Sequence, residues 1–345
     1  MPSRLRLSDK IVTRYQDSLI LSHRRFDAEA RPNIERMARY FKGDQWPAGK
    51  GDVSIPKVVV NLIFADVKVM LPVLALRNPR VFVKPTKATV TVPMPGAPDP
   101  TTGQPMPVPT PAQIINGKPV PVVAAAKAKE ALINWRWRNL GLTRQIRRCL
   151  VDSVLSPFGI MKIGFTLETE KVDVPDQPPT DPNAPPPDLL VVDEAIKAQS
   201  PYAVRWSPLD FRVDPEARYP DLSDAAWIAF GSLSRVEDIK KNPRYRNTRD
   251  LKGTVEVKQD YGYMSGPSAY YDKAKDTDPE EYQRVRLWEI WDKREGRLIT
   301  LADEHDKALE YRDWPLSFSG GFPSETLYFT EYPDTLYGPP DLMQV

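Results

Sequence analysis

The sequence has few of the residues that most metal and redox sites require. Its single cysteine, Cys149, excludes an intrachain disulfide, which fits a reducing cytoplasm or a particle assembled there. Cys149 lies in a helical pattern with no histidine nearby, so we expect a small core residue. The only two histidines, His23 and His305, are far apart in polar surroundings, which excludes a zinc site built on the usual Cys/His spacing.

Signals for membranes, nucleotides and nucleophilic catalysis are also missing. Even the apolar stretch Val58–Leu76 is interrupted by Asp66, Lys68 and Pro72, so it falls short of the roughly 18 uninterrupted apolar residues of a transmembrane helix. No apolar segment follows the first residues as in a secretory signal. Lys50 lacks the glycine spacing and the Ser/Thr of a P-loop, and no G-x-S-x-G sequence occurs. We therefore predict no membrane partner, no cofactor and no enzymatic activity.

What the sequence does contain is typical of a folded protein of about two domains. Of its 345 residues, 41% are hydrophobic and 27% charged, and a net charge of +2 argues against a general polyanion binder. The 37 prolines cluster between Pro93 and Pro121 and between Pro175 and Pro187. Because proline lacks a backbone donor, we expect these two segments to be extended, polyproline-like or disordered insertions rather than core elements.

The apolar periodicity predicts an α+β fold, mainly helical in its N-terminal half and β-rich in its second half. Residues 1–89 hold the N-terminal helices and a first strand at 80–84, and 90–123 form a proline-rich insertion. A helical pair and a strand occupy 124–167, and 168–200 form an acidic proline-rich insertion. The β-rich section covers 201–345. Within it, Ser234 and Glu237 are spaced as a capping box, and Glu295-Gly296 marks a hairpin turn.

Local signals bound the N-terminal helices. Pro32 suits the first turn of a second helix, and Gly43 suits the left-handed residue that ends it. Asn61 is a plausible N-cap for an apolar helix that Pro72 kinks and Asn78-Pro79 ends.

A basic segment carries the strongest candidates for an interaction surface. Trp135 and Trp137 precede a helix over 142–155 whose polar face holds Arg144, Arg147 and Arg148. These arginines could contact DNA phosphates or form a subunit interface, and we favour the interface because Arg and Trp are enriched in interface hot spots. Two residues apart, the tryptophans cannot share a helix face, so we expect one in the core and one facing a neighbour.

Three acids close together offer an alternative, a metal-assisted hydrolase or nuclease. Asp210, Asp214 and Glu216 could act as general acid and base or hold a divalent ion. The other interpretation is an Asp214-Pro215 turn in which the carboxylate accepts backbone amides, with Arg212 paired to one of the acids. We favour the turn.

Taken in order, these signals resemble a known family. The elements are Phe41-Lys42-Gly43-Asp44-Gln45-Trp46, the segment from Asn61 to Asn78-Pro79, Val81–Pro85, the helices of Ala124–Leu155 with Phe158-Gly159, Asp214-Pro215-Glu216-Ala217 and Leu336-Tyr337-Gly338. This pattern is similar to the N-terminal, wing-containing part of tailed-bacteriophage portal proteins, the head-to-tail connectors of the podovirus type. It covers most of the chain outside the proline-rich insertions.

The resemblance implies a structural virion protein rather than an enzyme. It implies a homo-oligomeric ring of about twelve subunits at one capsid vertex, assembled in the host cytoplasm and serving as a conduit for DNA packaging and ejection. The implied partners are the major capsid protein, terminase, head–tail adaptor or tail proteins, and double-stranded DNA bound non-specifically. Portals continue into stem and clip regions that have no counterpart here, so we expect a fragment of a longer protein. Another head–tail structural protein remains an alternative.

Overall fold

The computed structural model describes residues 9–45, 59–75, 80–85, 90–98, 105–115, 118–173, 192–254, 256–257, 271–272, 283–316, 318 and 321–344. The fold is α+β, with a helical N-terminal half and a β-rich second half, as the sequence predicts. It divides into two compact units, one formed by 1–73 with 145–345 and the other by 74–144. Among the described residues, no helix has the length and apolar character to cross a lipid bilayer.

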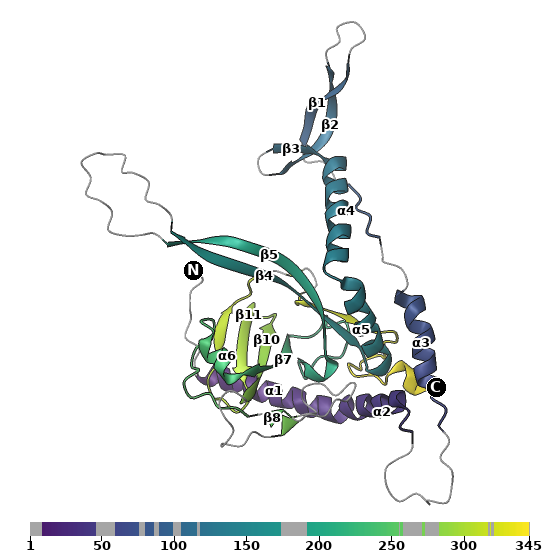
Figure 1. The fold of residues 1–345 in the computed structure, drawn as a ribbon, viewed down its shortest axis with the longest axis vertical. Helices are drawn as coiled ribbons and strands as arrows, with labels where there is room; N and C mark the ends of the chain where they lie inside the picture. The colour runs from purple at the N-terminus through teal and green to yellow at the C-terminus, as the bar shows by residue number, and fades with distance from the viewer. Residues whose placement is uncertain are drawn as a thin grey trace, which may run out of the picture. The chain divides into compact units, whose positions relative to one another are not determined.

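The larger unit is built in layers around a five-stranded antiparallel sheet (Figure 1). Its strand order is β12-β11-β10-β7-β6, with bounds Glu310–Asp313, Arg297–Ala302, Arg284–Asp292, Trp227–Arg235 and Phe211–Val213. The expected hairpin at Glu295-Gly296 is confirmed, because β10 and β11 pair from Asp292–Arg297 back to Leu287–Ala302. Gly296 there has a positive φ of 62°, which favours glycine.

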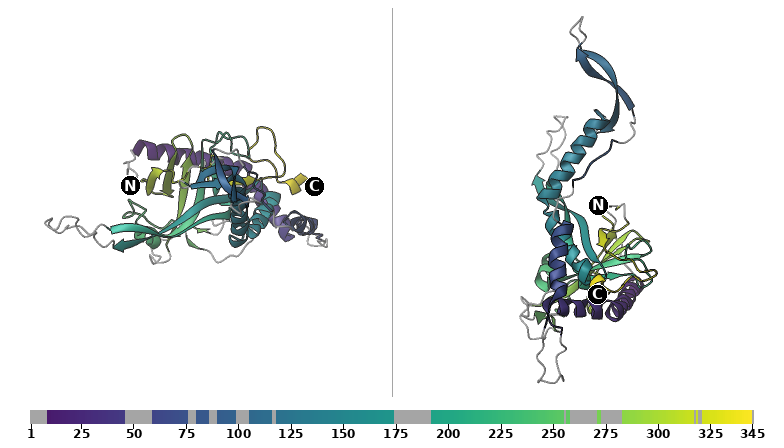
Figure 2. Two further views of the ribbon diagram at one scale, coloured as in Figure 1. Left: turned by 90° about the horizontal axis from the view of Figure 1, so that it is seen from above. Right: turned by 90° about the vertical axis from the view of Figure 1, so that its right-hand side faces the viewer.

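Helix α1, Asp9–Glu29, covers one face of this sheet, as the two views of Figure 2 show. Val12, Tyr15 and Leu19 recur at helical spacing and pack against Trp288 and Ile290 of β10. Helix α2, Arg31–Lys42, follows after Ala30, with Pro32 in its first turn as predicted.

The opposite face of the sheet meets the long hairpin of β4, Gly159–Asp173, and β5, Val192–Trp206. Lys162 of β4 pairs with Glu289 of β10 at 2.9 Å, and its ammonium lies over the Phe230 ring. A short strand β13, Ser324–Leu327, adds to the other edge of β4. Helix α5, Leu142–Leu155, packs on the start of this hairpin so closely that a Cβ at Gly159 would lie 2.3 Å from the carbonyl oxygen of Cys149.

Short elements complete the larger unit. They are a 3₁₀ turn at Pro208–Asp210, α6 at Val236–Lys241, β8 at Glu256–Val257, β9 at Tyr271–Asp272 and a 3₁₀ turn at Asp341–Gln344. The capping box expected at α6 is not formed. Arg235 is the N-cap without a side-chain bond, and Glu237 pairs instead with Lys241 one turn later.

The smaller unit contains α4, Val122–Asn139, and a three-stranded sheet. The strand expected at Arg80–Lys84 is wrong, because residues 80–85 are extended but join no strand among the described residues. Side chains of α4 take the place of a partner strand. Asn134 bonds both the N–H and the C=O of Val81, at 3.0 and 2.9 Å, and Glu130 accepts from the N–H of Val83.

The first proline-rich segment is extended, as expected, but it forms paired strands. These are β1, Val90–Pro98, β2, Pro105–Ile115, and β3, Lys118–Pro121. The register places Pro93 opposite Pro109 and Pro95 opposite Pro107. Residue pairs in an antiparallel ladder alternate between hydrogen-bonded and non-hydrogen-bonded positions. Prolines at the non-hydrogen-bonded positions therefore allow the residues between them to form the inter-strand hydrogen bonds. The ends of the acidic insertion likewise lie in β4 and β5, and 174–191 lie outside the described residues.

Candidate functional site

The Gly43 element ends α2 as the sequence predicts. Gly43 is left-handed, with φ 85°, and its N–H donates to Tyr40 O at 2.9 Å, while that of Asp44 donates to Arg39 O at 2.9 Å. These bonds satisfy carbonyls that the helix end would leave unpaired. Gln45 Nε2 donates to Val60 O at 3.2 Å, which ties the element to a segment 15 residues further along. Trp46 and Asn78-Pro79 lie outside the described residues.

Asn61 joins this element to the next helix. Its Oδ1 accepts the N–H of Phe64 at 3.0 Å, which is the predicted N-cap of α3, Leu62–Ala75. Its Nδ2 donates to Phe41 O at 2.9 Å, so one amide serves the start of α3 and the end of α2. The Phe41 and Phe64 rings meet edge to face at 5.3 Å. Two elements noted separately in the sequence thus form a single joint.

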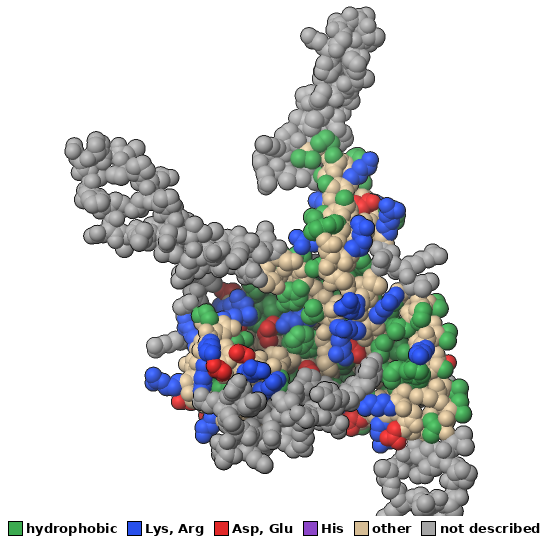
Figure 3. Space-filling view, viewed as in Figure 1, with side chains coloured by type: hydrophobic (Ala, Val, Ile, Leu, Met, Phe, Trp, Pro, Cys, Tyr) green, Lys and Arg blue, Asp and Glu red, His purple; other side chains and the backbone are tan. Residues whose placement is uncertain are grey.

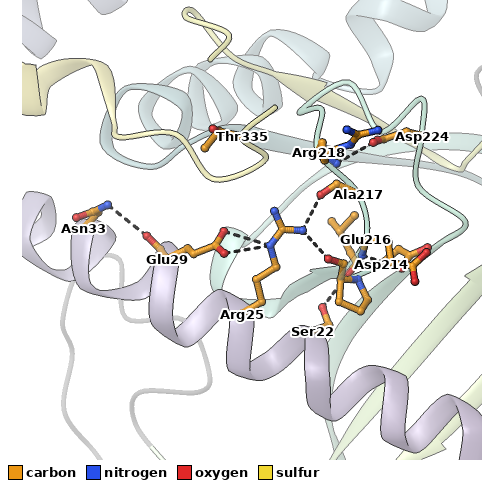
Figure 4. A network of polar contacts seen from close by, with 12 residues as sticks. Ser22, Arg25, Glu29, Asn33, Asp214, Glu216, Ala217, Arg218, Asp224 and Thr335 are labelled. Atoms are coloured by element: carbon orange, nitrogen blue, oxygen red, sulfur yellow. Dashed lines mark hydrogen bonds and ion pairs between the residues drawn. The ribbon is translucent and has the colours of Figure 1, made fainter. Parts of the chain in front are cut away.

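The Asp214-Pro215 element is a turn (Figure 4). The Asp214 carboxylate is buried, and its two oxygens accept the N–H groups of Glu216 and Ala226, each at 3.1 Å. The backbone of Asp214 also accepts from Ala217 N–H at 3.0 Å. The turn interpretation is therefore confirmed for Asp214, whose carboxylate is occupied by amides of its own loop.

Helix α1 holds this turn from below. Ser22 Oγ donates to Val213 O at 2.5 Å, and Arg25 Nη1 donates to Pro215 O at 2.8 Å and to Ala217 O at 2.6 Å. Arg25 is oriented by Glu29 one turn away. The arginine thus satisfies the carbonyls of a tight turn that has no strand partner for them.

The other two acids lie in different surroundings. Asp210 is buried, which raises the pKa of its carboxyl to about 6, and its Oδ1 has no hydrogen-bond partner among the described residues. Glu216 is exposed. Within the described part of the chain, no three His, Cys, Asp or Glu side chains are arranged to hold a metal ion.

Arg212 does not pair with these acids, contrary to the expectation. It is fully buried, and its guanidinium lies 4.0 Å from the Phe26 ring centre and 5.3 Å from that of Trp288. Nε donates to His23 Nδ1 at 2.9 Å, and Nη1 donates to Leu209 O and Phe211 O. Burial lowers the pKa of Arg212 to about 10 and that of His23 to about 3, so His23 is a neutral acceptor.

This arginine–histidine pair is not predicted by the sequence, in which His23 stands among polar neighbours. His23 instead meets the Trp288 ring edge to face at 4.7 Å. Its position between Leu19 and Phe26 on the apolar side of α1 was the available signal. His305 lines a surface cavity of about 390 Å³ with Thr254 and neighbouring acids, and none of the motif residues reaches that cavity.

The tryptophans and arginines predicted as an interaction surface are largely exposed. Trp135 is 48% exposed beneath the Arg136 guanidinium, whereas Trp137 is half-buried with an unpartnered Nε1 among the described residues. Arg144, Arg147 and Arg148 are all exposed, and Figure 3 shows basic side chains gathered over α5.

The opposite side of α5 packs into the core. Asp152 holds Arg205 of β5 in a two-pronged ion pair at 2.5 and 2.8 Å. Cys149 is buried, as expected, and burial raises the pKa of its thiol to about 12, so the thiol is unreactive.

A second exposed surface was missed as a candidate. Helix α3 is apolar around most of its circumference, with Asp66 and Lys68 its only charges, and of its residues only Val67 and Ala75 are buried. The sequence signal was present, because a helix that is hydrophobic on all sides is normally enclosed by other elements.

Neither the models of known protein families nor the curated proteins include a match to this chain.

Proposed function

We propose that this chain is the wing-containing part of a portal protein, which assembles with further copies of itself into a ring at one capsid vertex and serves as a conduit for double-stranded DNA. The observation that carries the proposal is the joint made by Gly43, Gln45 and Asn61. These residues belong to two separate elements of the portal pattern. Gly43 ends α2 and Asn61 begins α3, and the side chains of Gln45 and Asn61 form hydrogen bonds between the two elements.

The Leu336-Tyr337-Gly338 element supports the same proposal. Tyr337 is buried between Phe26 of α1 and Phe158, with ring centres 5.6 and 6.0 Å away. At Gly338 a Cβ would lie 2.3 Å from the Tyr332 ring, so no larger residue fits without movement. The last element of the portal pattern is thus packed against α1, the helix that precedes the first element.

The surface of the chain is also suited to an assembly. Large apolar side chains are exposed on α3 and α4, and arginines on α5. Aromatic residues and arginine are enriched in the buried centres of protein interfaces. Under this proposal the capsid protein, terminase and tail proteins are partners of the assembled ring, and DNA passes through it without being read.

The hydrolase alternative is weakened by one observation. The Asp214 carboxylate is buried and each of its oxygens accepts one backbone N–H, from Glu216 and from Ala226, whereas a general base must reach its substrate.

Native mass spectrometry and electron microscopy of the complete purified protein test the proposal. We expect a closed ring of about twelve copies with an axial channel, since head-to-tail contacts close when the rotation between copies is regular. A protein that stays monomeric at all concentrations and forms no ring in the virion would refute it.

A further inference from the structure

Helix α3 exposes a mainly apolar surface, here called the α3 face, in which Asp66 is the one acidic residue. Its apolar members are Leu62, Val69, Met70, Val73 and Leu74, whose side chains are 64%, 69%, 38%, 74% and 49% exposed. Figure 3 shows hydrophobic side chains along this helix. Scattered apolar residues on a surface need no explanation, but five on one 14-residue helix form a patch of the kind that marks an interaction site.

Among the described residues, the side chains of the α3 face are exposed rather than part of a buried core cluster. Asn61 caps the first turn of α3, Phe64 meets Phe41 there, and Val67 and Ala75 are the buried residues of the helix. The Lys68 ammonium lies over the Phe64 ring, 4.7 Å from its centre, so this side chain points towards the N-terminal half of α3. The residues from Val69 to Leu74 therefore present a nearly uncharged surface.

Helix α4 exposes a second and different apolar surface, here called the α4 stripe. It consists of Ala124, Ala128, Leu132 and Trp135, which are all exposed and follow one another at helical spacing. The stripe is shallow at its alanines and prominent at Leu132 and Trp135, which are 56% and 48% exposed. Lys127, Lys129 and Arg136 are close to it in the sequence.

The two surfaces complement each other. The branched side chains of Val69 and Val73 can enter the shallow part of the α4 stripe, in the way that ridges of one helix fill grooves of another. Asp66, the only acid on α3, would meet a helix with more basic than acidic side chains. The one acid of α4, Glu130, already accepts a hydrogen bond from Val83 N–H at 3.2 Å.

We propose that the α3 face of one copy docks on the α4 stripe of a second copy. Because the two surfaces differ, the contact is head-to-tail: a joined pair still offers one free α3 face and one free α4 stripe, and repetition gives a ring or a filament. The inference rests on the proposed function, because it names the contact by which the ring would form. A stable interface buries about 800 Å² per partner, so this helix pair would be the centre of a larger contact.

Cysteine pairing between two separate proteins tests this contact directly. One preparation of the complete protein carries Val73→Cys and the other Leu132→Cys with a size tag, and the two are mixed, allowed to assemble and oxidised. Cys149 is buried and unreactive, so it adds no background. We expect a disulfide-linked band containing one copy of each. The matched control replaces Leu316, an exposed apolar residue outside both surfaces, by cysteine and should give no such band with Leu132→Cys.

Other outcomes overturn the inference. A disulfide formed only between two Val73→Cys copies would show a symmetric contact. In a protein that carries both cysteines, a disulfide formed only within one chain would show that α3 covers its own α4. Capture of the protein by lipid vesicles through the α3 face, without linkage between copies, would assign the face to a membrane surface.

A substitution supplies an independent readout. Val73→Asp should weaken assembly about 10- to 100-fold in sedimentation, as expected for one residue at the centre of an interface, while its thermal melt matches that of Leu316→Asp. If rings form normally with Val73→Asp and no linkage occurs, this inference fails and the portal proposal stands. If the unchanged protein never assembles, the portal proposal fails with it.

Discussion

Helices α1 and α3 are both rich in apolar residues but use them in opposite ways. In α1 the buried apolar residues lie on one face, where Val12, Tyr15 and Phe26 are each no more than 3% exposed, and only Ile20 and Leu21 among its large apolar residues are exposed. In α3 the apolar residues surround the helix, and Val73 is 74% exposed. Helix α1 also fixes polar groups of its own fold, because Ser22 and Arg25 hold the Asp214 turn. The difference indicates that α1 stabilises the subunit, whereas α3 leaves apolar side chains exposed, which the proposed contact would cover.

The largest expected effect on stability comes from removing a buried side chain of α1. Phe26→Ala should lower the free energy of unfolding by about 3–5 kcal/mol, because it removes a buried ring and leaves a cavity. Val73→Ala should change it by less than about 0.5 kcal/mol, since that side chain is exposed in the free subunit. Chemical denaturation of both variants, as unassembled protein, measures the two values. Equal losses would show that α3 belongs to the core.

The Asp214 turn should give the next largest effect. Asp214→Ala leaves two amides without their acceptor, so we expect a loss of about 2 kcal/mol or more. Glu216→Ala, an exposed neighbour in the same loop, is the matched control and should change stability by less than about 0.5 kcal/mol. Thermal melts of the pair measure this, and similar melting points for both would contradict the arrangement in Figure 4.

The pair of His23 and Arg212 predicts a pH dependence. The pKa of His23 is lowered from 6.5 to about 3 in the folded protein by burial, followed by the nearby arginines. Protonation therefore favours the unfolded chain, and this contribution to stability is complete above pH 6.5 and lost as the pH falls towards 3. A single such group contributes a slope of at most about 1.4 kcal/mol per pH unit.

The variant His23→Gln tests this slope. Glutamine keeps an acceptor for Arg212 Nε but does not titrate, so its stability should fall less steeply than that of the unchanged protein between pH 6 and pH 4, measured by denaturation at each pH. Asp210 acts with the opposite sign, because its raised pKa favours the folded state most at low pH, and it is present in both proteins. Identical slopes would mean that His23 is not buried against Arg212.

The joint between α2 and α3 should give the smallest of these stability effects. Asn61→Ala removes an N-cap, which costs about 1 kcal/mol, and releases Phe41 O. Asn33→Ala is the control, because Asn33 of α2 makes an exposed bond to Glu29 O at the end of α1, away from α3. Hydrogen exchange of the α3 amides should increase in Asn61→Ala and stay unchanged in Asn33→Ala. Unchanged exchange in both variants would show that the hydrogen bonds of Asn61 do not hold α3 in place.

The parts of the fold that the sequence predicted depend on local chemistry. Gly43 and Asn61 end and begin helices through bonds to residues within four positions, and Asp214 binds amides of its own turn. Such signals can be read without knowing the rest of the structure. The hairpin turn at Gly296 is also a local signal. The turn requires a positive φ at that position, and glycine is the residue that adopts it most readily.

The parts that could not be predicted depend on contacts between distant segments. Arg212 was assigned to a neighbouring acid, but its partners come from α1, nearly 190 residues earlier, where His23 and Phe26 enclose it. The alternating pattern around Val81 predicted a strand, and side chains of α4 satisfy that backbone instead. The sequence predicted α3 as an apolar helix, but only its exposure in the structure distinguishes a surface helix from a core helix.

The most direct test of the proposed ring is the mass of the complete protein by native mass spectrometry, compared between the unchanged protein and Val73→Asp. We predict one closed assembly of about twelve copies for the unchanged protein and mainly monomers for the variant at the same concentration. A monomer for the unchanged protein at every concentration, or the same closed assembly for both, would contradict the role given to α3.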